Sequence, residues 1–576
     1  MRGLLERFGG YLPAVIALTL PIVYLLTASD SFILPRASIV IGGACICVGV
    51  ALLIPPAAGL GNLRLPLAVA VAAALLAFVF SVSWPLSLAG SYTRYESLPM
   101  RIAYLGLLAS SVWLLRTRRQ RDWLVGAFVF SVSVACIKAW FQWSSHAPFR
   151  PDGDLGNANQ LAALVVMAVP LAIDRARRNT MFIFAWVVAL VPLGVGLFVT
   201  TSRSGYLGVV AGGLALLALS VPRRFLVPAA AFSTAVIAAA LLVVSLTPLR
   251  ALNDDPPELR LHLWSDGLHL VAARPLTGWG EDATGLSFGR YLTRDYAGLV
   301  TFDRVHSGPI DIAATQGVLG LTALAWVVGL VLLTAWRRRE EPGVPGLAAA
   351  LVGFSVWVFF NFDWAPATGA FWLLAGTLWS SLLPTPGEIG LPHLMGKYPP
   401  KAGDGATWSS LLPIHGEVAR SARGALSSLL PIYGEVARSA RAVRSSLLRI
   451  YGEVARRARG AAASPALRSI LAIGLVIAAV ALAVLPILAD TWYLRGHPDL
   501  SVRADPLQAQ YHWAIGTTAE LRRAAELGET EPAMYVQLGD RERQAGDLGA
   551  ARRAYERALQ IDPYYSPATQ RLAELS

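Results

Sequence analysis

The sequence is poor in charge and in cysteine, and each shortage excludes a class of protein. Of its 576 residues, only 15% are charged, whereas 55% are hydrophobic. A soluble domain carries about 25% charged residues, so this composition excludes a soluble globular chain. The three cysteines, Cys45, Cys47 and Cys136, lie inside apolar runs without a partner at metal-ligand spacing. They predict buried packing rather than a disulfide framework or a metal site.

The motifs of nucleotide and metal chemistry are also missing. The chain has no glycine-rich loop with a lysine, and Gly278-Trp279-Gly280 is a lone glycine pair outside a dinucleotide fingerprint. His262 and His269 have no nearby cysteine or carboxylate set that would complete a metal site. We therefore expect no metal and no cofactor. The net charge of +12 would suit nucleic acid, but basic residues in a membrane protein usually mark cytoplasmic loops, so we expect no nucleic-acid partner.

Long apolar runs are abundant. A transmembrane helix needs about 20 mostly apolar residues, and the mean hydropathy of the chain is +0.52. The runs predict an all-α, polytopic membrane protein with about 12–13 transmembrane helices. The expected spans are residues 11–28, 33–55, 65–88, 101–116, 123–141, 160–174, 181–199, 206–220, 226–245, 309–335, 345–361, 366–383 and 467–489.

Arginine clusters predict the orientation. With the N-terminus inside, five successive inside loops hold arginine and the outside loops are mostly poor in it, as the positive-inside rule requires. The membrane domain would then cover 1–383 with a large outer loop at 246–308, and the segment 384–466 would be cytoplasmic. The inside clusters are Arg64; Arg116, Arg118, Arg119 and Arg121; Arg175, Arg177 and Arg178; Arg223 and Arg224; and Arg337, Arg338 and Arg339.

A few arginines expected on the outside run against this bias. They are Arg94, Arg150, Arg203 and several in the large loop, including Arg260. Arg203 lies in Thr201-Ser202-Arg203-Ser204-Gly205, which predicts a fixed cation with hydroxyls that holds a phosphate-like group. The alternative is an interfacial arginine that snorkels to lipid head groups. Arg260 lies near the start of an expected helix, where the alternative is an ordinary solvated residue.

His306 lies where the outer loop meets the span at 309–335. An imidazole titrates near neutral pH and can take a proton from a hydroxyl. A lone histidine is more often structural, and its position in the sequence leaves both readings open.

Residues 384–466 are repetitive. Three similar segments run from Ser409 to Arg420, from Ser427 to Arg438 and from Ser445 to Arg456, with a period of 18 residues. An arginine-rich repeat on the inside face could bind anionic membrane lipids. The alternative is a weakly ordered insertion without a catalytic role.

After the last span at 467–489, residues 490–576 form a soluble tail that we expect outside. Its residues match the tetratricopeptide-repeat pattern of aromatic, Leu-Gly, Ala, aromatic, Ala and Pro. One repeat cannot bury its own apolar face, so it should pack on the shortened neighbour at about 504–527, on the membrane domain or on a protein partner. The matching residues are Tyr535, Leu538, Gly539, Ala551, Tyr555, Ala558 and Pro563.

Several motifs together resemble the O-antigen ligase and polymerase superfamily of bacterial envelope glycosyltransferases. Gly153–Ala162 is similar to the family's Gly-Asn-x-Asn start of a span, and Thr201–Gly205 is similar to its Ser-Arg-Ser/Gly junction. The loop from Arg260 to His306, followed by Gly317–Leu321, is similar to its large outer loop and next span. The resemblance covers roughly residues 80–380. The tail is similar to tails of some members, and the repeats at 384–466 lie outside the pattern.

This resemblance implies a metal-independent, inverting glycan transfer at the outer face of the bacterial inner membrane. The donor would be a glycan on undecaprenyl diphosphate, and the acceptor a hydroxyl of lipid A–core, of a growing glycan or of a protein. It implies that Arg203 and Arg260 hold the diphosphate and that His306 orients or deprotonates the acceptor. Arg94 would be a further contact to phosphate or to a lipid head group.

Other functions stay open. Within the class, the chain could be a ligase, a polymerase or a protein O-oligosaccharyltransferase. A membrane transporter would place ionisable residues near the middle of its spans, whereas Lys138 and Arg36 lie close to expected span ends. An envelope assembly scaffold that acts through its tail would not need Arg203, Arg260 or His306.

Overall fold

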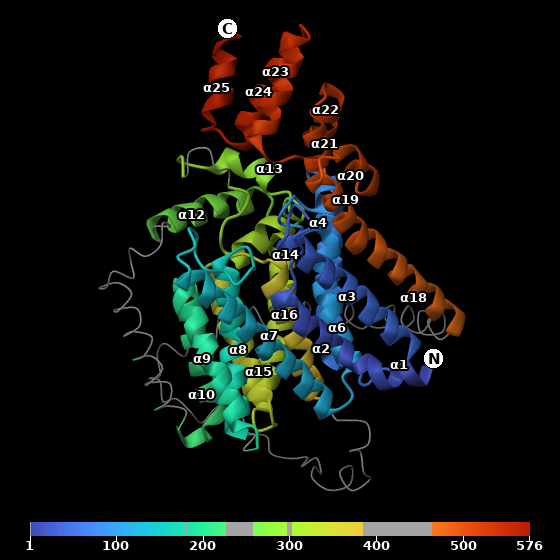
Figure 1. The fold of residues 1–576 in the computed structure, drawn as a ribbon, viewed down its shortest axis with the longest axis vertical. Coiled ribbons are helices and arrows are strands. Elements are labelled where there is room, and N and C mark those ends of the chain that lie inside the picture. The colour runs from blue at the N-terminus through green and yellow to red at the C-terminus, as the bar shows by residue number, and fades with distance from the viewer. Residues whose placement is uncertain are drawn as a thin grey trace, which may run out of the picture. The chain divides into compact units, whose positions relative to one another are not determined.

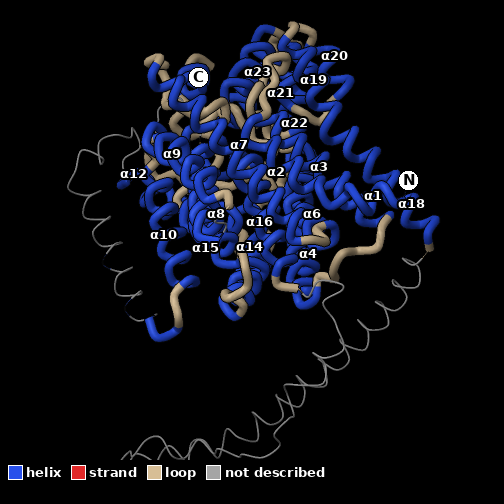
Figure 2. The backbone as a smooth tube through the Cα atoms, turned by 60° about the horizontal axis from the view of Figure 1, so that its bottom comes forward, coloured by secondary structure: helices blue, strands red, loops and turns tan. Residues whose placement is uncertain are grey.

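The computed structural model describes residues 2–178, 181–225, 257–296, 302–383 and 464–575, with single positions at 228 and 235. All regular structure in these ranges is helical, without a strand (Figure 2). This confirms the all-α prediction. The chain divides into two compact units, Met1–Pro386 with Ala472–Ser576, and Gly387–Leu471. The expected span at 226–245 and nearly all of the repeats at 384–466 lie outside the described residues.

Twelve of the thirteen expected spans are helices in the described residues. Eight helices are long and apolar enough to cross a membrane, and two more are shorter apolar helices, so the chain is a multi-pass membrane protein. The bundle helices, drawn in Figure 1, are α1 (Arg2–Phe8), α2 (Leu12–Ile22), α3 (Ile33–Leu53), α4 (Arg64–Val79), α6 (Leu98–Leu114), α7 (Arg118–Ser144), α8 (Ala158–Arg178), α9 (Ile183–Thr200), α10 (Arg203–Ser220), α14 (Gly308–Arg337), α15 (Val344–Phe359) and α16 (Ala365–Ser381), with short 3-10 turns at Gly9–Tyr11, Gly61–Leu63 and Arg223–Phe225.

The span expected at 65–88 ends earlier than its apolar run. Helix α4 stops at Val79, and a separate short helix, α5 (Trp84–Ala89), follows. Ser83 is the N-cap of α5, because its hydroxyl accepts a hydrogen bond from the Leu86 N–H. Ser81 adds a hydrogen bond of 2.7 Å to Ser87. Serines that bind nearby backbone compete with a continuous helix, and they explain the break.

Helix α14 is broken at Gly317, where φ is 69° and ψ is −178°. This conformation is open almost only to glycine. The loop at 275–280 fills the break, because the Trp279 N–H donates to the Ala314 carbonyl at 2.8 Å and the Val318 N–H donates to the Pro275 carbonyl at 2.7 Å. The segment from Pro275 to Gly280 therefore binds the backbone of α14.

The described residues of the expected outer loop, 257–296 and 302–308, contain three shorter elements. Helix α12 (Pro257–Ala273) is followed by α13 (Gly285–Phe288) and the 3-10 turn η5 (Gly289–Tyr291). Leu263, Leu270, Trp279 and Val305 form a small apolar core among them. We call the end of the bundle that carries α12 and α13 the α12 end (Figure 1).

The last span is a nearly continuous helix from α18 (Pro465–Ala479) through a π-helical turn (Val480–Val484) to α19 (Leu485–Leu494). The tail has α20 (Pro498–Ala504), α21 (Ala509–Ile515), α22 (Thr518–Leu527), α23 (Pro532–Gln544), α24 (Leu548–Ile561) and α25 (Ser566–Ala573). Tyr535 and Ala558 share a buried core with Leu521 and Leu527 of α22. The repeat thus packs on a helical neighbour.

Candidate functional site

Arg203 is the first residue of α10, directly after the two-residue link that follows α9. Thr201 in this link has a left-handed backbone with φ of 49°. Ser202 is the N-cap of α10, and its hydroxyl also donates to the side-chain oxygen of Asn159 at 2.9 Å. The link is therefore fixed to the start of α8, and this fixes the backbone position of Arg203. The Arg203 side chain is half-buried.

Arg260 lies in the first turn of α12 and is also half-buried. Its guanidinium donates to the carbonyl of Phe360 at 2.5 Å. One turn later, Trp264 packs against the ring of Phe359 at 5.6 Å between centroids and donates to the His306 carbonyl at 3.4 Å. These contacts tie α12 both to the end of α15 and to His306.

His306 has a left-handed backbone with φ of 58°, which is uncommon for a residue with a side chain. Its half-buried ring makes edge contacts with Phe302 and Phe362, with centroids 5.8 and 5.1 Å apart. Since a strained backbone persists only where neighbours fix it, these contacts hold the imidazole in one orientation.

Arg94 is paired with Asp303, with nitrogen–oxygen distances of 2.8 and 3.2 Å. Its guanidinium lies over the rings of Phe362 and Trp364, at 4.8 and 5.2 Å from their centroids. Burial alone would raise the pKa of Asp303, but Arg94 and Arg304, with a smaller effect of His306, bring it below its ordinary value. The Asp303 carboxylate is therefore ionised at neutral pH and lies within the electrostatic reach of His306.

One segment contacts Arg94, Arg260, His306 and the start of α10. We call Phe360–Trp364, between α15 and α16, the α15–α16 link. The Phe360 carbonyl accepts from Arg260, the Asn361 amide donates to Ser204 beside Arg203 at 2.9 Å, and the Phe362 ring lies between Arg94 and His306. The link thus brings together Arg94, Arg260, His306 and the start of α10.

Sequence reasoning missed this link and also Asp303. The link appeared only as the connection between two expected spans. A signal was present, because Asn361 and Asp363 are two polar residues in a short aromatic connection between apolar helices. Polar groups in such a place need partners, and both have them here.

A second group of charges lies deeper at the same end. Arg101 of α6 pairs with Asp363 at 2.9 Å and with Glu281 at 3.4 Å, and Arg304 pairs with Asp282. Both arginines are only 3% exposed. Burial raises the pKa of Glu281, although Arg101 opposes the rise. We call Arg101, Arg304, Glu281, Asp282 and Asp363 the buried ion network.

The comparisons with known families come from two separate parts of the chain. Residues 187–325 match the family described as O-antigen ligase. This part of the chain is therefore similar to O-antigen ligases. Residues 532–575 match the tetratricopeptide repeat, which confirms the second part of the resemblance. No curated protein matches the chain.

The O-antigen ligase match contains Arg203, Arg260, His306 and the break at Gly317. It supports a membrane protein that processes glycans in the manner of a ligase or polymerase, and a glycosyltransferase-like enzyme. Arg94 and the α15–α16 link lie outside the matched residues, so their connection to the matched part of the chain rests on the contacts described above.

Two cavities differ in their relation to this site. One, of about 440 Å³, is lined by Arg150, Asp152, Asp154 and Asn157 among others. Arg150 donates to the Thr200 carbonyl at 2.6 Å, so this polar cavity adjoins the α9–α10 link.

Within the described residues, no group of three or more His, Cys, Asp or Glu side chains could hold a metal ion.

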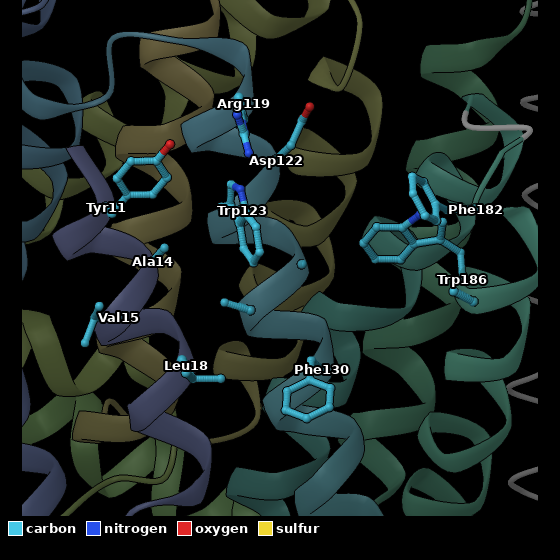
Figure 3. A pocket seen from close by; sticks show the side chains of 13 residues that line it. Tyr11, Ala14, Val15, Leu18, Arg119, Asp122, Trp123, Phe130, Phe182 and Trp186 are labelled. Carbon is cyan, nitrogen blue, oxygen red and sulfur yellow. The ribbon is translucent and has the colours of Figure 1, made fainter. Parts of the chain in front are cut away.

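The other cavity, of about 750 Å³, is mostly apolar and lies between α2, α7 and α9 (Figure 3). Trp123, Phe182 and Trp186 line it, while Arg119 and Asp122 are at one end and Phe130 is farther along (Figure 3). Arg119 belongs to the first turn of α7, at the opposite end of that helix from the 145–157 loop. This cavity is therefore separate from the candidate site.

Proposed function

We propose that this protein transfers a glycan from undecaprenyl diphosphate to an acceptor hydroxyl at the periplasmic face of the bacterial inner membrane. The observation that carries the proposal is the α15–α16 link, which contacts Arg260, His306, Arg94 and the residue next to Arg203 within three consecutive positions, Phe360 to Phe362. Cations and a histidine from distant parts of the sequence thus meet at one segment, and three of these residues lie in the part of the chain that matches the O-antigen ligase family.

The proposed step is a single displacement at the anomeric carbon. The acceptor oxygen forms a bond to this carbon while the bond from the carbon to the diphosphate oxygen breaks, and the configuration inverts. The hydroxyl proton passes to His306, and undecaprenyl diphosphate leaves with the bonding electron pair. Arg203 and Arg260 would stabilise the charge that develops on the leaving group, because fixed cations in a site that is partly shielded from water act strongly on such charge. This would make the reaction independent of a metal ion.

Arg94 would assist from the donor side. Its pairing with Asp303 and its stacking on Phe362 and Trp364 fix the guanidinium plane. A fixed planar guanidinium suits phosphate recognition better than a mobile lysine would. The polar cavity beside Arg150 offers space next to the α9–α10 link for part of the glycan or the diphosphate.

The test replaces His306 and Arg203 singly with alanine. Removing a general base typically costs about 10²–10⁴-fold in rate, so surface glycan should be lost while lipid-linked glycan accumulates. His262→Ala and Arg290→Ala serve as matched controls, because both residues are exposed in the same outer region. Membrane insertion of each variant is checked by immunoblotting of membrane fractions. Normal glycan in both site variants would contradict the proposal.

The accumulated intermediate distinguishes the reactions within the class. Full-length lipid-linked glycan favours a ligase or a protein O-oligosaccharyltransferase, and single lipid-linked units favour a polymerase. A glycosylated protein that disappears in the His306→Ala strain would identify the protein acceptor. Transfer by the purified protein in excess EDTA tests the metal-independent step.

A further inference from the structure

The tail is bound to the membrane domain close to the candidate site. Asp490, at the end of the last span, is fully buried. Its carboxylate accepts hydrogen bonds from the Asp30 N–H at 2.7 Å, from the Tyr92 hydroxyl at 2.8 Å and from the Tyr511 hydroxyl at 3.2 Å. One buried carboxylate therefore joins the first loop, the segment before α6 and the tail.

A second set of contacts lies at the segment around α5. The Ser83 hydroxyl donates to the Leu527 carbonyl at 3.3 Å, and the Gln508 amide donates to the Gly90 carbonyl at 3.3 Å. Gly528 follows α22 with φ of +93°, and a Cβ atom there would lie only 2.6 Å from the Ser83 hydroxyl. Glycine allows the tail backbone to approach the membrane domain this closely.

The third contact reaches the site itself. A Cβ atom on Gly285 of α13 would lie 3.3 Å from the Asp303 Cβ and equally 3.3 Å from the Thr530 Cγ2. Thr530 of the tail is therefore separated from Asp303 only by the backbone of α13. Asp303 in turn binds Arg94 through both oxygens. A short chain of contacts thus runs from the tail to the α15–α16 link.

Charge follows the same path. Glu531 is next to Thr530, and its side chain is exposed. Partial burial raises the pKa of Glu531, the Asp303 carboxylate adds to the rise, and Arg94 opposes it. Because Thr530 lies against α13 near Asp303 and Glu531 directly follows it, the Glu531 carboxylate lies close to the Arg94–Asp303 pair.

We propose that the tail completes the site within its own chain, with Thr530 supporting Asp303 and Glu531 acting as a positioning residue that sets the net charge at Arg94. The proposal rests on the proposed function, since it gives Arg94 a diphosphate to bind. A tetratricopeptide repeat usually offers a surface to another protein. Here the corner between α22 and α23 is used by the membrane domain, and transfer requires the tail to be docked.

The first variant separates the tail without altering it. Gly289 packs so closely on α24 that a Cβ atom there would overlap the carbonyl of Ile561. Gly289→Leu should push the tail away from α13 and lower transfer about ten- to hundredfold, because small displacements of positioning groups have effects of this size. Gly549→Leu is the matched control within the tail, where a Cβ atom meets only ordinary contacts at 3.5 Å or more. Full transfer by Gly289→Leu, with a tail that proteases now reach, would overturn the proposal.

The second variant tests charge alone. Glu531→Gln should tighten the binding of undecaprenyl diphosphate to the purified full chain about two- to tenfold at low salt, because it removes a negative charge from the surroundings of Arg94. The difference should vanish at high salt. Glu526→Gln, whose side chain is 66% exposed in α22, should have no effect. Equal binding by the wild type and Glu531→Gln at low salt, or a difference that salt does not reduce, would overturn the role of Glu531.

If Gly289→Leu fails to insert into the membrane, a disulfide cross-link tests whether the tail lies against α13. In Gly285→Cys/Thr530→Cys the new Cβ atom at position 285 lies 3.3 Å from the place of the Thr530 Cγ2, which a cysteine sulfur at position 530 can occupy. This approach suits a disulfide, whose two Cβ atoms are about 3.5–4.5 Å apart. The oxidised protein should form the bond and transfer glycan as well as the reduced protein does. Absence of the bond, or transfer blocked by it, would overturn the docked arrangement. Failure of the proposed function looks different, because undecaprenyl diphosphate would then bind Arg203→Ala as tightly as the wild type.

Discussion

The candidate site and the buried ion network lie at the same end of the bundle, but their arginines differ in how deeply they are buried. Arg94, Arg203 and Arg260 are half-buried, and so is His306. Arg101 and Arg304 are only 3% exposed and are paired with carboxylates. A ligand can reach the first group and not the second. Pairing alone does not make this distinction, because Arg94 is also paired, with Asp303. The depth of burial, more than the side of the membrane, separates a structural arginine from a candidate binding residue.

The two groups are also physically joined. The α15–α16 link carries Phe362, which contacts Arg94 and His306, and next to it Asp363, which pairs with Arg101. Arg304, which is paired with Asp282, lies two residues before His306. The network therefore acts as the support on which the site residues are held, and its loss should first affect stability.

The largest expected effect is a loss of stability on substitution of Arg101, which would distinguish the buried ion network from the candidate site. Arg101→Met leaves Glu281 and Asp363 without their shared cation, and removal of one partner from a buried pair costs about 3–5 kcal/mol. We expect a large fall in melting temperature in detergent and little inserted protein. His306→Ala, in contrast, should lose transfer and keep its melting temperature within a few degrees. An Arg101→Met protein that is stable and inactive would move Arg101 from the support into the site.

A backbone substitution should have a smaller effect on the same support. Gly317→Ala would place a methyl group onto the Leu276 carbonyl in a conformation that alanine avoids, which we expect to cost about 1–3 kcal/mol. Gln316 beside it donates to Glu281 at 2.5 Å, so the change should also disturb the network. Gly329→Ala in the same helix has no atom within 4 Å of the new Cβ and should be neutral or slightly stabilising. Equal thermal stability of the two variants would show that the break is not needed.

The sequence predicted the helices, which the structure confirms, and it singled out a few arginines whose role stays a prediction. Apolar length identifies a span, and an arginine against the orientation bias is costly enough to stand out. This reasoning found Arg203 and Arg260 and gave the short link before α10. It could not find the α15–α16 link, because the contacts of Asn361 and Phe362 are made with residues far away in the chain.

The network and the helix break were missed for related reasons. Arg101 coincided with the expected start of a span, and Arg304 was one of several loop arginines whose burial depends on Asp282. Gly317 lies in an apolar run that is compatible with a straight helix, and only the approach of the loop at 275–280 gives it a broken backbone. Such features depend on tertiary packing, which single-sequence patterns do not contain.

A third substitution, in the tail, tests whether burial alone, without the buried ion network, sets the protonation of a carboxylate. Glu529 in the tail is 7% exposed and accepts hydrogen bonds from the N–H groups of Thr530 and Glu531 at 2.8 and 3.1 Å. Burial raises the pKa of Glu529 to about 7, and the two N–H groups only partly oppose the rise. Because the folded tail then binds the proton more tightly than the unfolded tail, its stability should be highest in acid. It should fall by up to about 1.4 kcal/mol per pH unit between the ordinary glutamate pKa and pH 7.

Glu529→Gln should remove this slope, since the glutamine oxygen still accepts both hydrogen bonds and carries no titrating proton. Thermal unfolding of the full chain at pH 5 and pH 8 measures the difference, and Glu526→Gln on the exposed face of α22 controls for the loss of one negative charge. A slope that persists in Glu529→Gln would assign the pH dependence to another group. If the slope disappears, burial sets the protonation of Glu529 in the tail. In the buried ion network, in contrast, paired arginines oppose the rise in pKa that burial causes.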